Sequence, residues 1–125
     1  MGFLDGLLGN ASEITPEAIR KEFETLLAPE EQVLKAYQLI RDFFIFTDFR
    51  LLLVDKQGVT GKKISYHSVP YRSITHFIIE TSGHLDLDAE LKIWVSGSAE
   101  PLHQSFSKKV NVYEVQALLA GMIRR

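Results

Sequence analysis

The stretch that decides the fold lies near the middle of the chain, where residues 43–54 read FFIFTDFRLLLV. It holds two apolar runs, Phe43–Phe46 and Phe49–Val54, separated by Thr47 and Asp48, which favour a tight turn. Runs of about four to eight aromatic and branched residues between turn residues predict strands. Their nearly continuous apolar character predicts cover on both faces. Either an oligomer interface or a well-filled core would account for so many large apolar side chains.

Further strand-like runs lie on both sides of this stretch. They are rich in β-branched and aromatic side chains, and turn residues such as Asp55–Gly58, Pro70 and Ser82–His84 separate them. No helical pattern interrupts residues 30–107, which indicates an antiparallel barrel or sandwich. The predicted strands are Gln32–Ile40, Phe43–Phe46, Phe49–Val54, Lys62–Val69, Ser73–Thr81, Glu90–Val95 and Leu102–Phe106.

Helices are predicted at both ends of the chain. Apolar residues within 3–8 fall at helical spacing, and a second helix starts at Thr15-Pro16 and ends near Pro29. At the other end, Asn111 caps an amphipathic helix, and Glu114 is placed to complete a capping box. We therefore expect one mainly β domain, residues 1–125, with three parts: a helical N-terminal extension (1–29), a seven-stranded antiparallel barrel (30–107) and a capping helix (111–125).

Composition excludes several classes of function. The 125 residues include no Cys, which excludes disulfides, Cys-zinc sites and thiol catalysis. The formal charge is −2 and no dense Lys/Arg cluster occurs, so we do not expect nucleic-acid binding. No apolar run approaches the roughly 20 residues of a membrane span. The N-terminus lacks the basic region of a signal peptide, so we expect a cytoplasmic protein.

Two motifs resemble a known family. Residues 46–77 read FTDFRLLLVDKQGVTGKKISYHSVPYRSITHF, and residues 86–97 read DLDAELKIWVSG. Together with the C-terminal helix, they resemble the bacterial pleckstrin-homology family, roughly from Phe3 onward. The resemblance implies a PH-like barrel with the helix at one opening. It also implies that single-domain members form cyclic rings, namely pentamers, with a hydrophilic surface where strands of neighbouring subunits meet.

On this resemblance we expect a non-enzymatic binding or scaffold domain, with itself and another protein as partners. A strand edge can capture an extended peptide by β-augmentation, as in phosphotyrosine-binding relatives of the fold. The candidate partner-binding residues are polar side chains on and near the third to fifth predicted strands, chosen for their expected exposure: Arg50, Lys62, Lys63, Tyr71 and Arg72.

No residue set predicts catalysis, a metal or a cofactor. His67 and His76 lie on adjacent predicted strands and could approach each other, but no third ligand has an obvious spacing. Phosphoinositide recognition in eukaryotic PH domains needs several basic residues on the first two strands. Here Arg41 stands beside Asp42 and the basic pattern is missing.

The alternative function is a peripheral membrane or lipid-binding module. Phe3, Leu4, Leu7 and Leu8 form a short apolar segment that could anchor the chain to a bilayer. No flanking Lys or Arg is present to attract anionic lipid. Packing of this segment over the barrel or a neighbouring subunit is therefore favoured over membrane contact.

Overall fold

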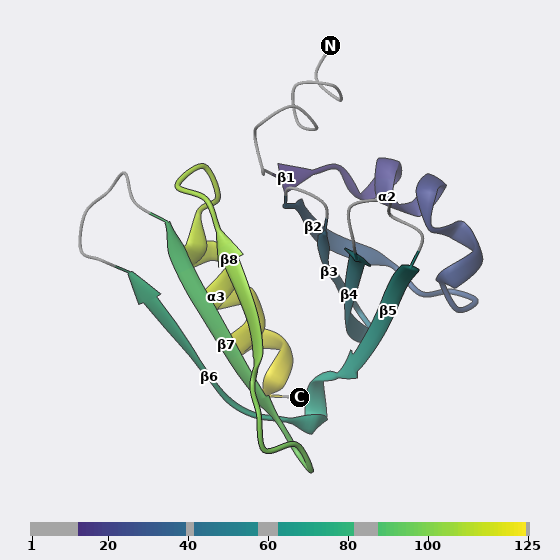
Figure 1. Ribbon diagram of the computed structural model, residues 1–125. Coiled ribbons are helices and arrows are strands. Elements are labelled where there is room, and N and C mark those ends of the chain that lie inside the picture. Colours follow the sequence, from purple (N-terminus) through teal and green to yellow (C-terminus); the bar gives the residue numbers. More distant parts are fainter. Residues whose placement is uncertain (1–12, 40–41, 58–62, 82–87, 125) are drawn as a thin grey trace. The chain divides into compact units, whose positions relative to one another are not determined.

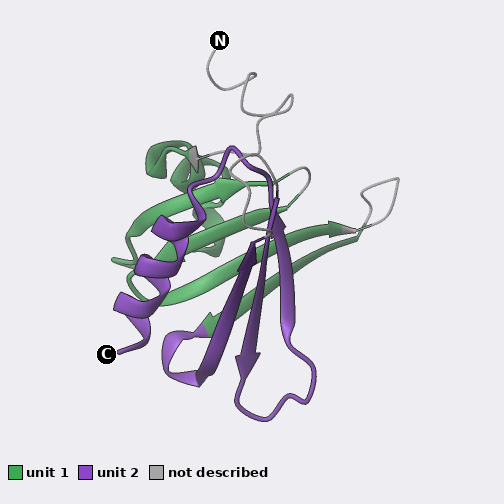
Figure 2. Ribbon diagram, turned by 90° about the vertical axis from the view of Figure 1, so that its left-hand side faces the viewer, with its two compact units in different colours: residues 1–69 green, residues 70–125 purple. Residues whose placement is uncertain are grey.

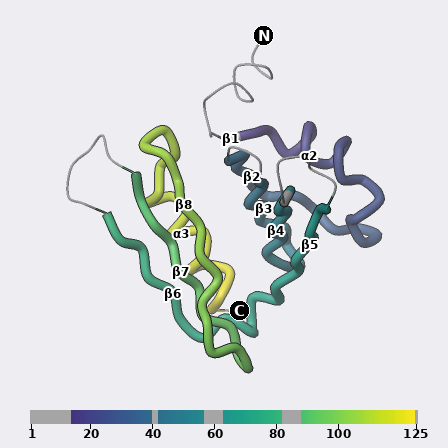
Figure 3. Tube along the Cα trace, in the orientation of Figure 1, coloured from purple at the N-terminus to yellow at the C-terminus, as the bar shows by residue number. Residues whose placement is uncertain are grey.

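The computed structural model describes residues 13–39, 42–57, 63–81 and 88–124. The chain divides into two compact units, residues 1–69 and 70–125, shown in green and purple in Figure 2. Figure 1 labels the elements and Figure 3 traces the same path along the Cα atoms. The elements are β1 (Glu13–Ile14), α2 (Pro16–Glu22), η1 (Glu24–Leu26), β2 (Val33–Gln38), β3 (Phe43–Thr47), β4 (Arg50–Gln57), β5 (Lys63–Pro70), η2 (Tyr71–Ser73), β6 (Ile74–Thr81), β7 (Ala89–Val95), β8 (Leu102–Phe106) and α3 (Val112–Ile123).

The first unit is built on a five-stranded sheet with the order β1-β2-β3-β4-β5. Its central hairpin pairs β3 with β4 in an antiparallel ladder that runs from Phe43 opposite Val54 to Phe46 opposite Leu51. The predicted turn between these strands is present. The hydroxyl oxygen of Thr47 accepts hydrogen bonds from the amides of Phe49 and Arg50, each 3.0 Å long.

Both faces of this sheet are covered at β3 and β4. The side chains that face α2 and η1 form one buried cluster of Ile19, Phe23, Val33, Ala36, Phe43, Ile45, Leu52 and Val54. The intervening Phe44, Phe46 and Leu51 point to the opposite face and are also buried. The predicted two-sided cover is therefore confirmed. On one face, α2 and η1 of the same chain cover the apolar side chains of the sheet, so no oligomer interface is needed to explain the apolar residues of that face.

Helix α2 begins where the sequence predicts and ends sooner. Thr15 Oγ1 accepts a hydrogen bond of 3.2 Å from the amide of Ala18, and Pro16 takes the first helical position, where no amide hydrogen is needed. The helix ends at Glu22 and a single 3₁₀ turn, η1, follows. The chain therefore turns back before Pro29.

A helical extension over the whole of residues 1–29 is not what the structure has. Glu13 and Ile14 form the short strand β1, which pairs with Tyr37 and Ala36 of β2. Two residues carry no periodic pattern, so the sequence alone did not indicate this strand. The helix predicted within residues 3–8 lies outside the described residues.

The second unit consists of the antiparallel sheet β6-β7-β8 and helix α3. Asn111 caps the helix as predicted, since its side-chain oxygen accepts from the amides of Tyr113 and Glu114 at 3.2 and 3.3 Å. The helix packs against β6 and η2 and buries Val115 and Leu119 fully. Within the described ranges, no helix has the length and apolar character needed to cross a bilayer.

The predicted closed barrel is wrong. Each of the seven predicted strands has a counterpart, β2 to β8, but these strands belong to two separate sheets. Pro70 ends β5 without an amide hydrogen to donate, and the 3₁₀ turn η2 redirects the chain before β6 begins. β5 and β6 therefore follow each other along the chain without pairing. The coarser prediction of a mainly β fold with a C-terminal helix is confirmed.

Candidate functional site

The edge strand β5 presents its side chains to solvent on both faces. Among its eight residues only Val69 is buried. Ile64 and Tyr66 are 39% and 47% exposed although their side chains are largely apolar, and they alternate along the strand with exposed residues such as Lys63 and His67. An edge strand of this kind is where a further strand can add to a sheet.

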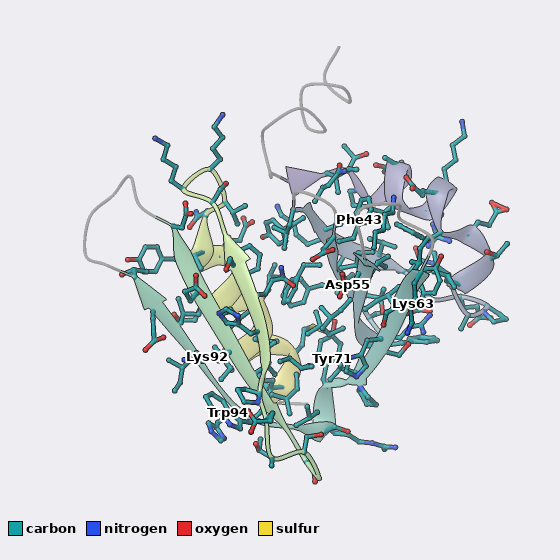
Figure 4. The ribbon with its side chains drawn as sticks, viewed as in Figure 1. Phe43, Asp55, Lys63, Tyr71, Lys92 and Trp94 are labelled. Carbon is teal, nitrogen blue, oxygen red and sulfur yellow. The ribbon has the colours of Figure 1, made fainter. Side chains whose placement is uncertain are left out.

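The second sheet has an exposed outer face. The register of β6 with β7 places His76 opposite Trp94, Ile78 opposite Lys92, and Glu80 on the same face. The His76 and Trp94 rings stack with their centroids 4.5 Å apart and an interplanar angle of 11°. The ammonium of Lys92 lies 3.7 Å from the carboxylate of Glu80. Figure 4 labels Lys92 and Trp94 on β7.

A second polar group continues this face onto β8. The imidazole Nε2 of His103 contacts the carboxylate of Glu90, and Ser105 Oγ donates to the same carboxylate at 3.0 Å. His103 and Glu90 are 53% and 39% exposed, so their pairing contributes about 1 kcal/mol or less. The described part of the chain holds no group of three or more His, Asp or Glu side chains placed to bind a metal.

The structure describes four of the five predicted contact residues. Lys63 starts β5 and Arg72 lies in η2, and both are exposed. Lys62 lies outside the described residues. The expected exposure of Tyr71 is wrong, because this side chain is only 7% exposed in η2, the turn that packs against α3. Figure 4 labels Lys63 and Tyr71.

Arg50, the remaining predicted contact, is bound to a buried carboxylate. Its Nε and Nη2 donate to Oε2 and Oε1 of Glu31, each at 2.9 Å. Burial by itself raises the pKa of Glu31. Hydrogen bonds from Arg50, from the Thr47 hydroxyl and from the Ala28 amide outweigh that effect and hold the pKa below its ordinary value of 4.5. The charge of Arg50 is therefore compensated within the chain.

Sequence reasoning missed Glu31, whose side chain is fully buried. One signal was present, because Arg50 is the only charged residue in the apolar run 49–54, and a charge in a buried strand needs a partner. The sequence offers 16 acidic residues for that role and no spacing rule that selects Glu31.

The sequence places His67 and His76 on adjacent predicted strands, but the sheet topology does not pair these strands. His67 lies on β5 and His76 on β6, and these strands belong to different sheets. The two histidines therefore do not face each other across one ladder. Instead, His76 stacks on Trp94 and its Nδ1 lies 3.1 Å from the Thr75 hydroxyl.

Comparison with known sequences identifies the family. The model of the bacterial PH domain family matches residues 2–123. The Bacillus subtilis protein YjqA, which is uncharacterized, is 50% identical over 123 residues, or 98% of each chain. A second uncharacterized protein of B. subtilis, YozO, is 31% identical over 99 residues, covering 79% of this chain and 84% of its own.

Comparison with known structures agrees with this assignment. A protein with a pleckstrin-homology domain from Shewanella loihica is 49% identical, with a TM-score of 0.82 over 92% of this chain and 98% of its own. A pleckstrin-homology domain from Shewanella amazonensis is 48% identical, with a TM-score of 0.80 over 98% of both chains. A PH-domain-containing protein from Exiguobacterium sibiricum shares the fold, with a TM-score of 0.66 at 24% identity over 90% of this chain and 61% of its own. The chain belongs to the bacterial PH domain family.

Proposed function

We propose that this protein is a non-enzymatic, cytoplasmic PH-like scaffold that forms a cyclic homo-oligomer and offers a polar inter-subunit surface to a protein partner. The observation that carries the proposal is the edge strand β5, which is eight residues long and exposed from Lys63 to Ser68 except at the half-buried Ser65. Proteins that stay monomeric usually shorten or cover such an edge. A long, open edge instead favours addition of another strand.

A second edge supports assembly into a ring. β5 and β6 end different sheets and carry different side chains. A contact between β5 of one copy and β6 of the next is therefore heterologous, and heterologous contacts that close form rings. The ring order in this proposal, five, comes from the resemblance to single-domain members of the family.

We treat residues 1–125 as one domain in this proposal. The family match runs through both compact units, from residue 2 to residue 123, and YjqA matches over nearly the whole chain. The matched structures are PH-domain proteins, which supports binding in preference to catalysis. Because one fold hosts many functions, the binding surface itself must be tested.

Light scattering coupled to size exclusion, at two salt concentrations, tests the assembly. We expect a mass near five times the 14.2 kDa of the chain, unchanged by salt. A monomer at both salt concentrations contradicts the ring. In that case, co-sedimentation with liposomes, comparing the full chain with one that starts at Thr15, decides whether the N-terminal apolar segment anchors the protein to a membrane.

Proline substitution tests whether the β5 edge makes the contact. Successive amides along a strand point to opposite edges, so one of Ser65 and Tyr66 donates toward β4 and the other points away from the sheet. Of the variants Ser65→Pro and Tyr66→Pro, we expect one to destabilise the fold and the other to remain folded with a lower mass. If the variant that remains folded keeps the wild-type mass, β5 is excluded as the assembly edge.

A further inference from the structure

Arg50 connects three segments of the first unit through one guanidinium group. Besides its two bonds to Glu31, Nη2 donates to the carbonyl oxygen of Leu26 at 2.7 Å, and Nη1 donates to Oγ of Ser68 at 2.6 Å. Leu26 ends η1, Glu31 lies in the loop that follows, and Ser68 lies on β5. The side chain therefore reaches from the helical segment to the edge strand.

Glu31 fixes the orientation of this guanidinium. Its Oε2 also accepts from Thr47 Oγ1 at 2.6 Å, and its Oε1 accepts from the amide of Ala28 at 2.9 Å. Each carboxylate oxygen thus has two donors. Because a bidentate arginine–carboxylate pair holds the guanidinium in one plane, Nη1 is directed at Ser68 as long as Glu31 stays in place.

The helical segment that Arg50 contacts covers an apolar face of the sheet. This α2–η1 cover (residues 16–26) places Ile19 and Phe23 in the buried cluster with Phe43 of β3. The rings of Phe23 and Phe43 meet edge-on with their centroids 5.0 Å apart. A second arginine, Arg20 on α2, donates to the backbone oxygen of Glu31 at 2.8 Å. Movement of the cover therefore moves the loop that carries the carboxylate.

We infer that Arg50 is a positioning residue that couples the α2–η1 cover to the edge strand β5. This inference rests on the proposed use of β5 as a binding edge. A strand bound at β5 orders Ser68, and Arg50 transmits that order to Leu26 and Glu31. Coupling between two segments is reciprocal, so loosening of the cover weakens binding at β5 by the same factor.

This role differs from the direct partner contact that the sequence predicted for Arg50. Its side chain is 22% exposed and its donors bind groups of its own chain. In this inference the partner contacts exposed residues of β5, such as Lys63, Ile64 and Tyr66. Arg50 acts on that surface through the strand that carries it.

Hydrogen–deuterium exchange of the full chain tests the coupling from both ends. Ser68→Ala removes the hydrogen bond between Arg50 and β5. Glu31→Gln alters the pair that Arg50 makes with the loop after the cover. We expect each variant to speed exchange in both β5 and the α2–η1 cover. The segment that loses its own bond should exchange roughly tenfold faster, the factor for one hydrogen bond to a charged group, and the other segment severalfold faster.

Two controls separate coupling from general loosening. Ser65→Ala changes the same residue type on the same strand, three residues before Ser68 and outside its contact with Arg50, so it should leave exchange in both segments unchanged. Peptides from β3 (Phe43–Thr47), which is buried in the same unit, report general loosening of that unit and should exchange at the wild-type rate. If Glu31→Gln speeds exchange in β3 as well, Arg50→Lys replaces it, because lysine keeps the charge and lacks the planar fork. Ser68→Ala that speeds exchange in β5 alone overturns the inference.

Light scattering on the same samples distinguishes this inference from the proposed function. Coupled exchange in a monomer supports the coupling and contradicts the ring. If the protein forms a ring but exchange in the cover and in β5 changes independently, the coupling is contradicted and the proposed ring is still supported. When both hold, dilution that dissociates the ring should speed exchange of the cover together with that of β5, although the cover is not at the edge.

Discussion

Arg50 and Glu31 meet through two parallel hydrogen bonds, Nε to Oε2 and Nη2 to Oε1, each 2.9 Å long. They lie 19 residues apart, on β4 and in the loop after η1. The Glu31 carboxylate is fully buried, so a variant that disrupts the pair leaves a polar or charged group without its partner in the interior.

Glu31→Gln is expected to lower the free energy of unfolding by roughly 3 kcal/mol. This is the lower end of the cost of breaking a buried pair, because Arg50 retains some access to water. Urea unfolding followed by circular dichroism measures the change. Glu24→Gln removes the same charge from an exposed position in η1 and should stay within about 0.5 kcal/mol of the wild type.

The same carboxylate gives stability a predictable pH dependence. The folded-state pKa of Glu31 is held below its ordinary value of 4.5, so its contribution is fully present above that value. The contribution is lost as the pH falls through the folded pKa. Unfolding free energies measured from about pH 7 to pH 3 should therefore fall more steeply for the wild type than for Glu31→Gln. Parallel curves for the two proteins would contradict the depressed pKa.

Phe23→Ala tests the packing of the cover on the sheet. The buried ring of Phe23 contacts Phe43, and its removal leaves a cavity against β3. We expect a loss of about 3–4 kcal/mol in the free energy of unfolding. Leu34→Ala truncates a side chain that is 42% exposed and should cost clearly less. Equal losses for the two variants would show that the α2–η1 cover does not bury Phe23 against the sheet in solution.

Tyr71 and its predicted companions should respond differently to substitution. Tyr71→Ala is expected to cost about 3 kcal/mol because the side chain is buried in η2. Lys63→Ala and Arg72→Ala should stay within about 0.5 kcal/mol of the wild type because both side chains are exposed. Thermal melts of the three variants check the expectation. If the Tyr71 side chain were exposed at the surface, the three variants would have similar melting temperatures, which would contradict the prediction.

Asn111→Ala should weaken the start of α3. The side-chain oxygen of Asn111 accepts from the amides of Tyr113 and Glu114 in the first turn of the helix. Its loss is expected to cost about 1 kcal/mol, and Asn111→Asp should recover most of that because a carboxylate also caps. Chemical unfolding of the two variants provides the measurement. Equal stability of Asn111→Ala and the wild type would mean that the cap is not formed.

The sequence predicted strands and helix caps well because their signals are local. Turn residues such as Thr47 and Asp48 separate runs long enough to be strands, and Asn111 marks the start of α3. The corresponding elements lie where these patterns place them, from β2 to α3.

What the sequence did not reveal depends on distant pairing. Pro70 predicts the end of a strand, yet no local pattern indicates that β5 and β6 belong to different sheets. The buried pair of Glu31 and Arg50 forms between segments that only the fold brings together. The burial of Tyr71 is missing from the sequence pattern for the same reason, because it depends on tertiary packing around η2.

The two-sided cover of β3 has a consequence for how the chain tolerates change. In a strand with one face in water, alternate positions accept many residue types. All five positions of β3, Phe43–Thr47, are buried, so a saturation scan should find no permissive alternation there. β5 offers the opposite, since only Val69 is buried. A spectroscopic label or a cross-linking residue is therefore best attached to β5, where the fold leaves room for it.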